Sequence, residues 1–174
     1  MSTPTTQTND VDVTRIASLV EQYKADPEAA QSFWSVRTQW TGGFRTATYA
    51  RQHAPIVTDE PGWLAGTDTA PNPVEQVLAA LGSCLSVGYA AQAAARGINL
   101  RSLEVEVKGN VDLRVFLGLA EGHAGYNKLE VTTYIDSDAD PEQLEELHAA
   151  VIGTSPVGNT LERPVELEAR LVKV

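Results

Sequence analysis

The segment from Val77 to Ala95 carries no charged residue, and alanine is its commonest residue. A helix that is apolar on nearly all sides lies either at the centre of a protein core or in a membrane. This segment barely reaches the ~20 residues that a bilayer requires, and several glycine, serine and glutamine residues dilute it. The sequence therefore predicts a core helix whose small residues allow close packing against another helix, and it predicts no membrane partner.

Both ends of this helix are marked in the sequence. Pro73 suits the first helical position, where its missing N–H costs nothing, and Glu75 suits the positive end of the helix dipole. Arg96 and Gly97 provide a basic last turn followed by a glycine stop. We therefore expect one long helix over residues 74–96.

The chain before this helix alternates between elements and breaks. Apolar residues at helical spacing predict a helix over Val13–Ala30, which Asp26-Pro27 interrupts. Two extended segments, Ser32–Trp40 and Phe44–Gln52, flank a Gly42-Gly43 turn and predict a β-hairpin. The proline- and glycine-rich segment 53–73 is expected to be a loop, and a loop of that length is usually functional or a lid.

The chain after the helix favours strands. Leu103–Leu113 alternates apolar and charged residues, Leu129–Ile135 does the same, and Pro164–Val174 is expected to be the last strand. Between them, Asp140-Pro141-Glu142 opens a helix that Gly153 ends. This order predicts an α+β fold with antiparallel or mixed sheets, not a regular βαβ array.

Length and charge limit the function classes. A chain of 174 residues is expected to form one domain. The formal net charge of -10, with scattered lysines and arginines, argues against a nucleic-acid partner. Met1–Val11 has no signal-peptide pattern and is expected to be a flexible tail, so we expect a cytoplasmic protein.

The single cysteine, Cys84, lies in the core helix and leaves a free thiol to explain. It is either a small core residue or a nucleophile, and a nucleophile needs a nearby cation to favour the thiolate. His53, His123 and His148 are too far apart in sequence for metal-ligand spacing, so no metal site is expected. No nucleotide-binding motif is present and we expect no cofactor.

Three segments, in order and spacing, resemble the OsmC/Ohr family of thiol-dependent peroxidases and their relatives. They are NPVEQVLAALGSCL, from Asn72 through the cysteine, ARGINLRSLEVEVKGNVDL after the helix, and SPVGNTLERPVELEARL near the C-terminus. The resemblance covers the chain from about Trp34 to its end. It implies an OsmC-like domain over residues 32–174, a helical extension over residues 12–31 and a flexible tail over residues 1–11.

The resemblance also implies the assembly. Members of this family form an intertwined homodimer in which antiparallel or mixed sheets wrap two long central helices. We therefore expect a homodimer of this chain with that OsmC-like fold.

The residues of the family's peroxidase site map onto this chain only in part. Cys84 matches the attacking cysteine, whereas Ser155 stands where peroxidases of the family have a second cysteine. In those peroxidases a glutamate directly follows the proline. Val74 occupies that position here, so the next residue, Glu75, is the candidate for the glutamate. Arg45 is the first candidate for the arginine that holds the thiolate, and Arg51 is the alternative candidate. The two arginines have odd numbers in one strand region, so we expect them on the same face. Ser155 is otherwise a turn residue or a hydrogen-bond donor to a ligand.

Three functions remain open at this point. The first is a one-cysteine peroxidase for small apolar organic hydroperoxides that is active in the oxidative stress response. In this case an external thiol reduces the sulfenic acid formed on Cys84. The second is another use of the thiol, such as sulfur or acyl transfer. The third is a binding protein for a small ligand in which Cys84 only packs, so the sequence leaves open whether the protein is an enzyme.

Overall fold

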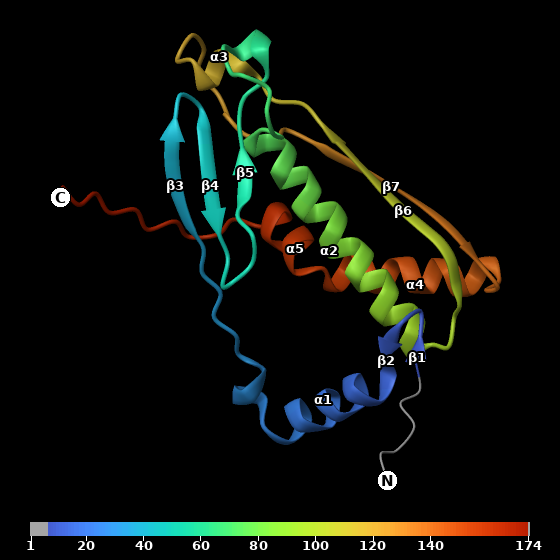
Figure 1. Cartoon of the computed structure of the whole chain (residues 1–174). Coiled ribbons are helices and arrows are strands. Elements are labelled where there is room, and N and C mark those ends of the chain that lie inside the picture. Colours follow the sequence, from blue (N-terminus) through green and yellow to red (C-terminus); the bar gives the residue numbers. More distant parts are fainter. Residues whose placement is uncertain (1–6, 174) are drawn as a thin grey trace. The chain divides into compact units, whose positions relative to one another are not determined.

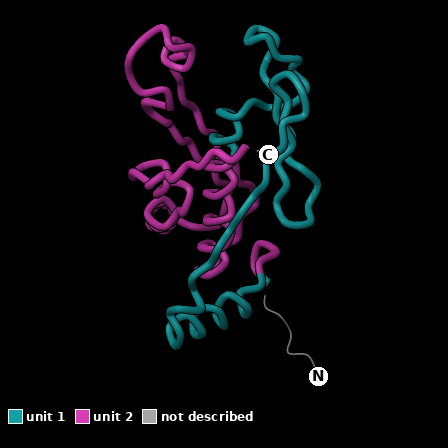
Figure 2. Tube along the Cα trace, turned by 90° about the vertical axis from the view of Figure 1, so that its left-hand side faces the viewer, with its two compact units in different colours: residues 1–7, 12–79 teal, residues 8–11, 80–174 magenta. Residues whose placement is uncertain are grey.

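The computed structural model describes residues 7–173 and shows an α+β fold in which helices alternate with small antiparallel sheets (Figure 1). The α+β prediction is confirmed. The described chain divides into two compact units (Figure 2), and the expected domain bounds stay a prediction. Unit 1 comprises residues 1–7 and 12–79, and unit 2 comprises residues 8–11 and 80–174, so the boundary falls within the long helix.

The N-terminal strands differ from the expected flexible tail. Residues 1–6 of that tail lie outside the described residues, but β1 (Gln7–Thr8) pairs with β2 (Val11–Asp12). The side chain of Asn9 donates to the carbonyl of Ile98 at 2.9 Å and accepts from the N–H of Leu100 at 2.8 Å. These two bonds hold residues 8–11 to the rest of unit 2.

The helical extension of unit 1 has the two pieces that Asp26-Pro27 predicts. Asp12 caps α1 (Val13–Ala25) by accepting from the N–H of Arg15, and Asp26 caps the short 3-10 helix η1 (Pro27–Ala30) in the same way, from Ala29. No residue of either helix is buried.

The sheet of unit 1 contains the predicted hairpin. β3 (Arg37–Gly42) pairs antiparallel with β4 (Arg45–Tyr49), and Gly42 and Gly43 have φ of 110° and 60°, which favour glycine. A third strand, β5 (Ile56–Thr58), pairs with β4 and is followed by the 3-10 helix η2 (Gly62–Leu64). Both lie in the segment for which the sequence predicts only a loop.

The core of unit 2 forms around the C-terminal part of α2 (Pro73–Ala95), the predicted long helix. Its buried residues pack with Leu147 and Val151 of α4 (Pro141–Thr154). At the closest approach, a Cβ on Gly88 would lie 3.1 Å from a methyl carbon of Val151. The small residues of the helix therefore permit the close helix–helix packing that the sequence predicts.

One face of this core is covered by a two-stranded antiparallel ladder. It joins β6 (Leu100–Gly109) to β7 (Leu129–Ser137), with Val105 opposite Thr133. The apolar residues of the ladder pack against the buried cluster of α2: Leu100, Leu103, Val105, Val107, Leu129, Val131 and Ile135. α2 is also the one helix in the described part of the chain that is long and apolar enough to cross a membrane, a test that core helices of soluble proteins pass as well.

Three segments of unit 2 differ from the predictions. Two short helices, α3 (Leu113–Phe116) and α5 (Pro156–Glu162), were not expected. The predicted strand Pro164–Val174 is not formed over residues 164–173, and Leu167 and Leu171 are 90% and 99% exposed. The alternation of this segment is real, but a strand needs a neighbouring edge to hydrogen-bond, and this segment pairs with none in the described chain.

Candidate functional site

Cys84 lies on α2 between two buried core residues, Leu81 and Leu85, and its own side chain is half-buried. It is thus not sealed among aliphatic side chains. The thiol sulfur lies 3.3 Å from the hydroxyl oxygen of Ser155, which is 71 residues away in the sequence. The structure therefore brings together two of the predicted site residues within unit 2.

Ser155 is held at the junction of two helices. It follows the last residue of α4 and caps α5, where its hydroxyl oxygen accepts from the backbone N–H of Gly158 at 3.1 Å. The side chain is only 4% exposed. Gly158 permits this approach, because a Cβ at that position would lie 3.1 Å from the Ser155 hydroxyl oxygen.

This geometry determines what the hydroxyl can do. A serine hydroxyl has one proton and two lone pairs, and the N–H of Gly158 uses one lone pair. The proton of Ser155 is free to point at the sulfur of Cys84. The contact can therefore stabilise negative charge on the sulfur, since a hydrogen bond to an ionised group favours that form.

Arg45 and Arg51 occupy different kinds of backbone. Arg45 begins β4, and its Nη1 donates to the hydroxyl of Thr67 at 3.3 Å. Arg51 lies beyond the end of β4 in a turn with φ of 52°, where its guanidinium contacts the Nε2 of His53 at 3.0 Å and lies 5.9 Å above the ring of Trp34. The expectation that they share a strand face is wrong, because strand periodicity ends before Arg51.

Glu75 forms a capping box at the start of α2. Its N–H donates to the Asn72 side chain at 2.9 Å, and its carboxylate accepts from the N–H of Asn72 at 2.8 Å. Asn72 also donates to the carboxylate of Glu60 at 3.3 Å. One carboxylate oxygen of Glu75 is therefore used to begin the helix.

Asp59 and Thr67, in unit 1, were not singled out from the sequence. Asp59 is 1% exposed, and its carboxylate accepts from the hydroxyls of Thr67 and Thr69 at 2.6 and 2.9 Å. Chiefly because of the bond from Thr67, the pKa of Asp59 lies well below its usual range. The available signal was an acid directly after a strand, followed by two threonines in Gly66-Thr67-Asp68-Thr69.

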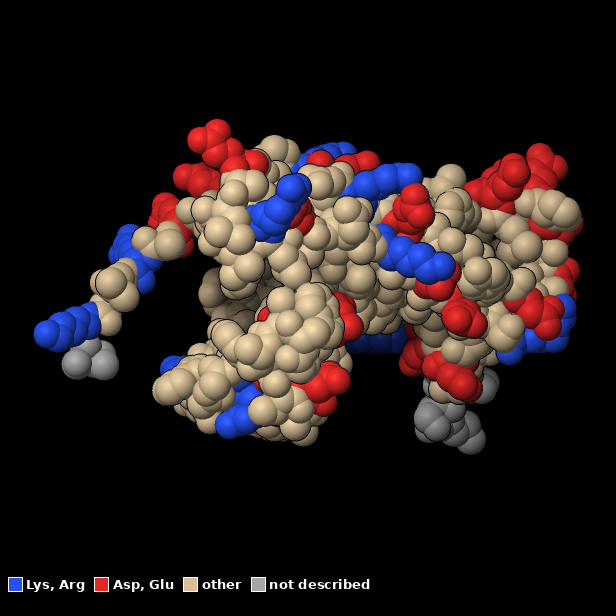
Figure 3. All heavy atoms as spheres, turned by 90° about the horizontal axis from the view of Figure 1, so that it is seen from above, with Lys and Arg blue, Asp and Glu red and all other residues tan. Residues whose placement is uncertain are grey.

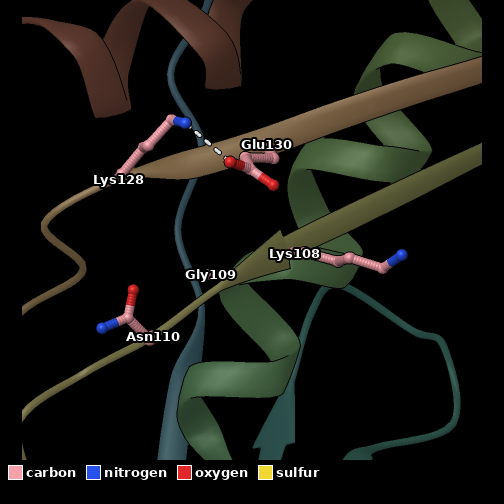
Figure 4. A pocket seen from close by; sticks show the side chains of 5 residues that line it. All are labelled: Lys108, Gly109, Asn110, Lys128 and Glu130. Carbon is pink, nitrogen blue, oxygen red and sulfur yellow. Dashed lines mark hydrogen bonds and ion pairs between the residues drawn. The ribbon is translucent and has the colours of Figure 1, made fainter.

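A cavity of about 230 Å³ lies at the end of the β6–β7 ladder (Figure 4), and none of the predicted site residues lines it. Lys108, Gly109, Asn110, Lys128 and Glu130 line it. Lys128 pairs with Glu130 at 2.6 Å and Lys108 with Glu106 at 2.8 Å, so both cations are already neutralised. This cavity is a poor candidate for an anion site.

Other site types find little support in the described residues. Among residues 7–173, no three histidine, cysteine, aspartate or glutamate side chains are grouped so as to hold a metal ion. On the face shown in Figure 3, lysine and arginine side chains lie among acidic ones and do not gather in one patch. The contact between Cys84 and Ser155 is therefore the strongest candidate for chemistry.

Comparison with known proteins identifies the family. The sequence profile of the family described as OsmC-like protein matches residues 66–170, which is more than half of the chain. This chain belongs to the OsmC-like protein family. The match includes Cys84 and Ser155 and begins after Arg45 and Arg51. The predicted family resemblance is confirmed.

Solved structures of OsmC-like proteins share the fold at low sequence identity. An OsmC-like protein from Mycoplasma pneumoniae is 19% identical with a TM-score of 0.66, covering 76% of this chain and 89% of that one. An organic hydroperoxide resistance protein OsmC from Legionella pneumophila is 16% identical with a TM-score of 0.58, covering 75% and 91%. One from Elizabethkingia anophelis is 17% identical with a TM-score of 0.55, covering 74% and 89%. No curated protein matches this chain.

Proposed function

We propose that this OsmC-like protein is a one-cysteine peroxidase that reduces small apolar organic hydroperoxides through Cys84. The observation that carries the proposal is the contact of the half-buried Cys84 sulfur with the hydroxyl of Ser155 at 3.3 Å. Two structural neighbours named for organic hydroperoxide resistance support the substrate class. The protein would act in the oxidative stress response in the cytoplasm.

The reaction proceeds in two stages. The thiolate of Cys84 attacks the terminal oxygen of R–O–OH, so that an S–O bond forms, the O–O bond breaks and the alkoxide leaves and takes a proton to become the alcohol. Cys84 is then a sulfenic acid. An external thiol attacks this sulfur and releases water, and a second thiol cleaves the mixed disulfide and restores Cys84.

The role of Ser155 follows from its hydrogen bonds. It cannot form the disulfide that a second cysteine at this position would form, so the reductant must come from outside the protein. The N–H of Gly158 donates to one lone pair of the Ser155 oxygen, which leaves the hydroxyl proton available. The hydroxyl can therefore donate to the thiolate before the attack and to the sulfenate oxygen after it. Arg45 supplies the positive charge that favours the thiolate, with Arg51 as the reserve.

A second copy of this chain completes the proposed assembly. The exposed alternating residues of segment 164–173 lack a strand partner in the described chain, as a segment that pairs with another protomer would. Ser83 and Val87 are exposed on one face of α2, and the small residues of this helix make that face suitable for packing against a second helix. We therefore include the homodimer in the proposal.

Steady-state turnover tests the proposed activity. The wild-type protein is expected to consume cumene hydroperoxide with dithiothreitol as reductant, and Cys84→Ser is expected to lose this activity while remaining folded. A parallel arm offers a persulfide donor and an acyl thioester, with intact mass as the readout. Adducts of Cys84 with these donors and no peroxide turnover would replace the peroxidase proposal with group transfer, and no reaction in either arm would leave only ligand binding.

A further inference from the structure

Ser155 stands where the chain passes from α4 to α5. Its backbone is extended, with φ of -65° and ψ of 117°, so neither helix ladder fixes its conformation. A rotation at this residue would turn the two helices relative to each other and carry the hydroxyl with them. The 3.3 Å contact between the Ser155 hydroxyl and the Cys84 sulfur therefore depends on the bonds that hold this junction.

The side chain of Asn159, in α5, spans the junction. Its Nδ2 donates to the carbonyl of Ser155 at 2.9 Å and to the carbonyl of Gly153 at 3.3 Å. A side-chain amide has two N–H donors, one for each of these carbonyls. Gly153 lies in the last turn of α4, where a helix has no N–H of its own to offer its carbonyls. Asn159 therefore binds the end of α4 and the residue that precedes α5 at the same time.

The helix that carries Asn159 is itself held against the core of unit 2. Val157 packs against the buried cluster that includes α2, and a Cβ on Gly158 would lie 3.8 Å from a methyl carbon of Leu81, one turn before the cysteine. The carbonyl of Ser155 also accepts from the backbone N–H of Asn159 at 2.9 Å. Ser155 is thus gripped by a helix that rests on the same core helix as Cys84.

We propose that Asn159 is a positioning residue whose side-chain amide holds the backbone of Ser155 so that the Ser155 hydroxyl donates to the thiolate of Cys84. Asn159 acts on the sulfur only through Ser155. The inference rests on the proposed role of Ser155 as a donor, and all the residues that it uses belong to unit 2.

A cycle of two substitutions separates this role from simple helix capping. Asn159→Leu removes both donors with little change in volume and adds no charge. Ser155→Ala removes the hydroxyl but keeps the carbonyl that Asn159 binds. If Asn159 only caps α4, its loss will affect Cys84 equally with and without the hydroxyl. If it positions Ser155, its loss will affect Cys84 only when the hydroxyl is present.

The readout is the pH dependence of Cys84 alkylation by iodoacetamide, which is unambiguous because the chain has one cysteine. Ser155→Ala is expected to raise the alkylation midpoint by about one pH unit, the size of one lost hydrogen bond to an ionised group. Asn159→Leu is expected to raise it by about half a pH unit or more. The double variant is expected to have the midpoint of Ser155→Ala alone.

Two further measurements serve as controls. Asn159→Leu is expected to lower the unfolding temperature by the same amount in both backgrounds, because its lost bonds are to backbone carbonyls. Thr160→Val removes a hydroxyl that donates to the carbonyl of Pro156 at 2.8 Å within α5. This variant is expected to keep the wild-type midpoint.

The outcomes separate the inference from the function on which it rests. An unchanged midpoint in Asn159→Leu, equal shifts in the two backgrounds, or a shift in Thr160→Val overturns the positioning role and leaves the proposed function intact. An unchanged midpoint in Ser155→Ala overturns the role of Ser155 and the inference with it. If the wild type turns over no peroxide while the cycle behaves as expected, the peroxidase proposal fails and the inference holds, because alkylation needs no peroxide. If Asn159→Leu does not fold, Asn159→Ala removes the same donors, and a wild-type midpoint in that variant contradicts the inference.

Discussion

The thiol of Cys84 and the hydroxyl of Ser155 are far apart in the sequence and 3.3 Å apart in space. Helix α2 provides the first, and the junction of α4 and α5 provides the second. Cys84 already stood out as the only cysteine, whereas Ser155 was predicted only through the family resemblance, since no spacing rule joins positions that meet by tertiary packing. Asp59 and Thr67 were missed for a related reason: hydrogen bonds across a loop leave no periodic pattern.

Ser155→Cys tests the geometry of this pair. The S–S bond is about 2.05 Å long, so two sulfurs placed near the present 3.3 Å separation need only a small movement to join. After one equivalent of cumene hydroperoxide, the variant is expected to lose two hydrogens by intact mass and to resist alkylation. Persistence of two alkylatable thiols after peroxide treatment would contradict the placement of Ser155 beside Cys84.

Because the Tyr89 side chain is buried, we expect the folded protein to lose stability at alkaline pH. Its ring is fully buried, its hydroxyl bonds to His148, and burial raises its pKa above the usual value of about 10. The folded state thus disfavours ionised Tyr89, so the stability this group contributes is full below about pH 10 and is lost as pH rises toward the folded pKa.

Tyr89→Phe removes the ionisable group and its hydrogen bond. The variant is expected to be less stable by about 1 kcal/mol at pH 7 and to lose less stability than the wild type between pH 9 and 11. Urea unfolding across this range measures both effects, with exposed Tyr134→Phe as the control. Equal alkaline losses in Tyr89→Phe and the wild type would show that another group is responsible.

At the scale of elements, strong local patterns were predictive. Residues 73–95, the β3–β4 hairpin, the β6 and β7 strands and the helix capped by Asp140 all formed as expected. Pro164–Val174 did not form a strand, because alternation shows which faces are apolar but does not supply a partner edge. α5 was missed because Ser155, for which the sequence predicts a turn or a ligand contact, caps a helix whose first residue is Pro156.

Substitutions in the capping box of α2 distinguish a helix-capping role of Glu75 from a catalytic one. Asn72→Ala removes the side chain that caps the helix and is expected to destabilise the protein by about 1 kcal/mol. Glu75→Gln keeps a side-chain acceptor at the third helical position and is expected to leave peroxide turnover and stability close to those of the wild type. A turnover at least tenfold lower in a folded Glu75→Gln would give this carboxylate a catalytic role instead.

At the scale of the whole molecule, the exposed C-terminal segment bears on the assembly. If it pairs with a second copy, its apolar residues become buried there, and charges at these positions will oppose association. Leu167→Lys combined with Leu171→Lys is expected to weaken the dimer at least tenfold in sedimentation equilibrium. Glu168→Gln, in the same segment, is the control that should leave the dimer unchanged, and a monomeric wild type would contradict the proposed assembly.

The account as a whole depends on whether the sulfur of Cys84 reacts with a hydroperoxide. Intact-mass and peptide analysis after cumene hydroperoxide in the presence of dimedone measures this directly. We predict one dimedone adduct per chain, at Cys84, and none without peroxide. A thiol that accepts iodoacetamide but never forms the dimedone adduct would contradict the account.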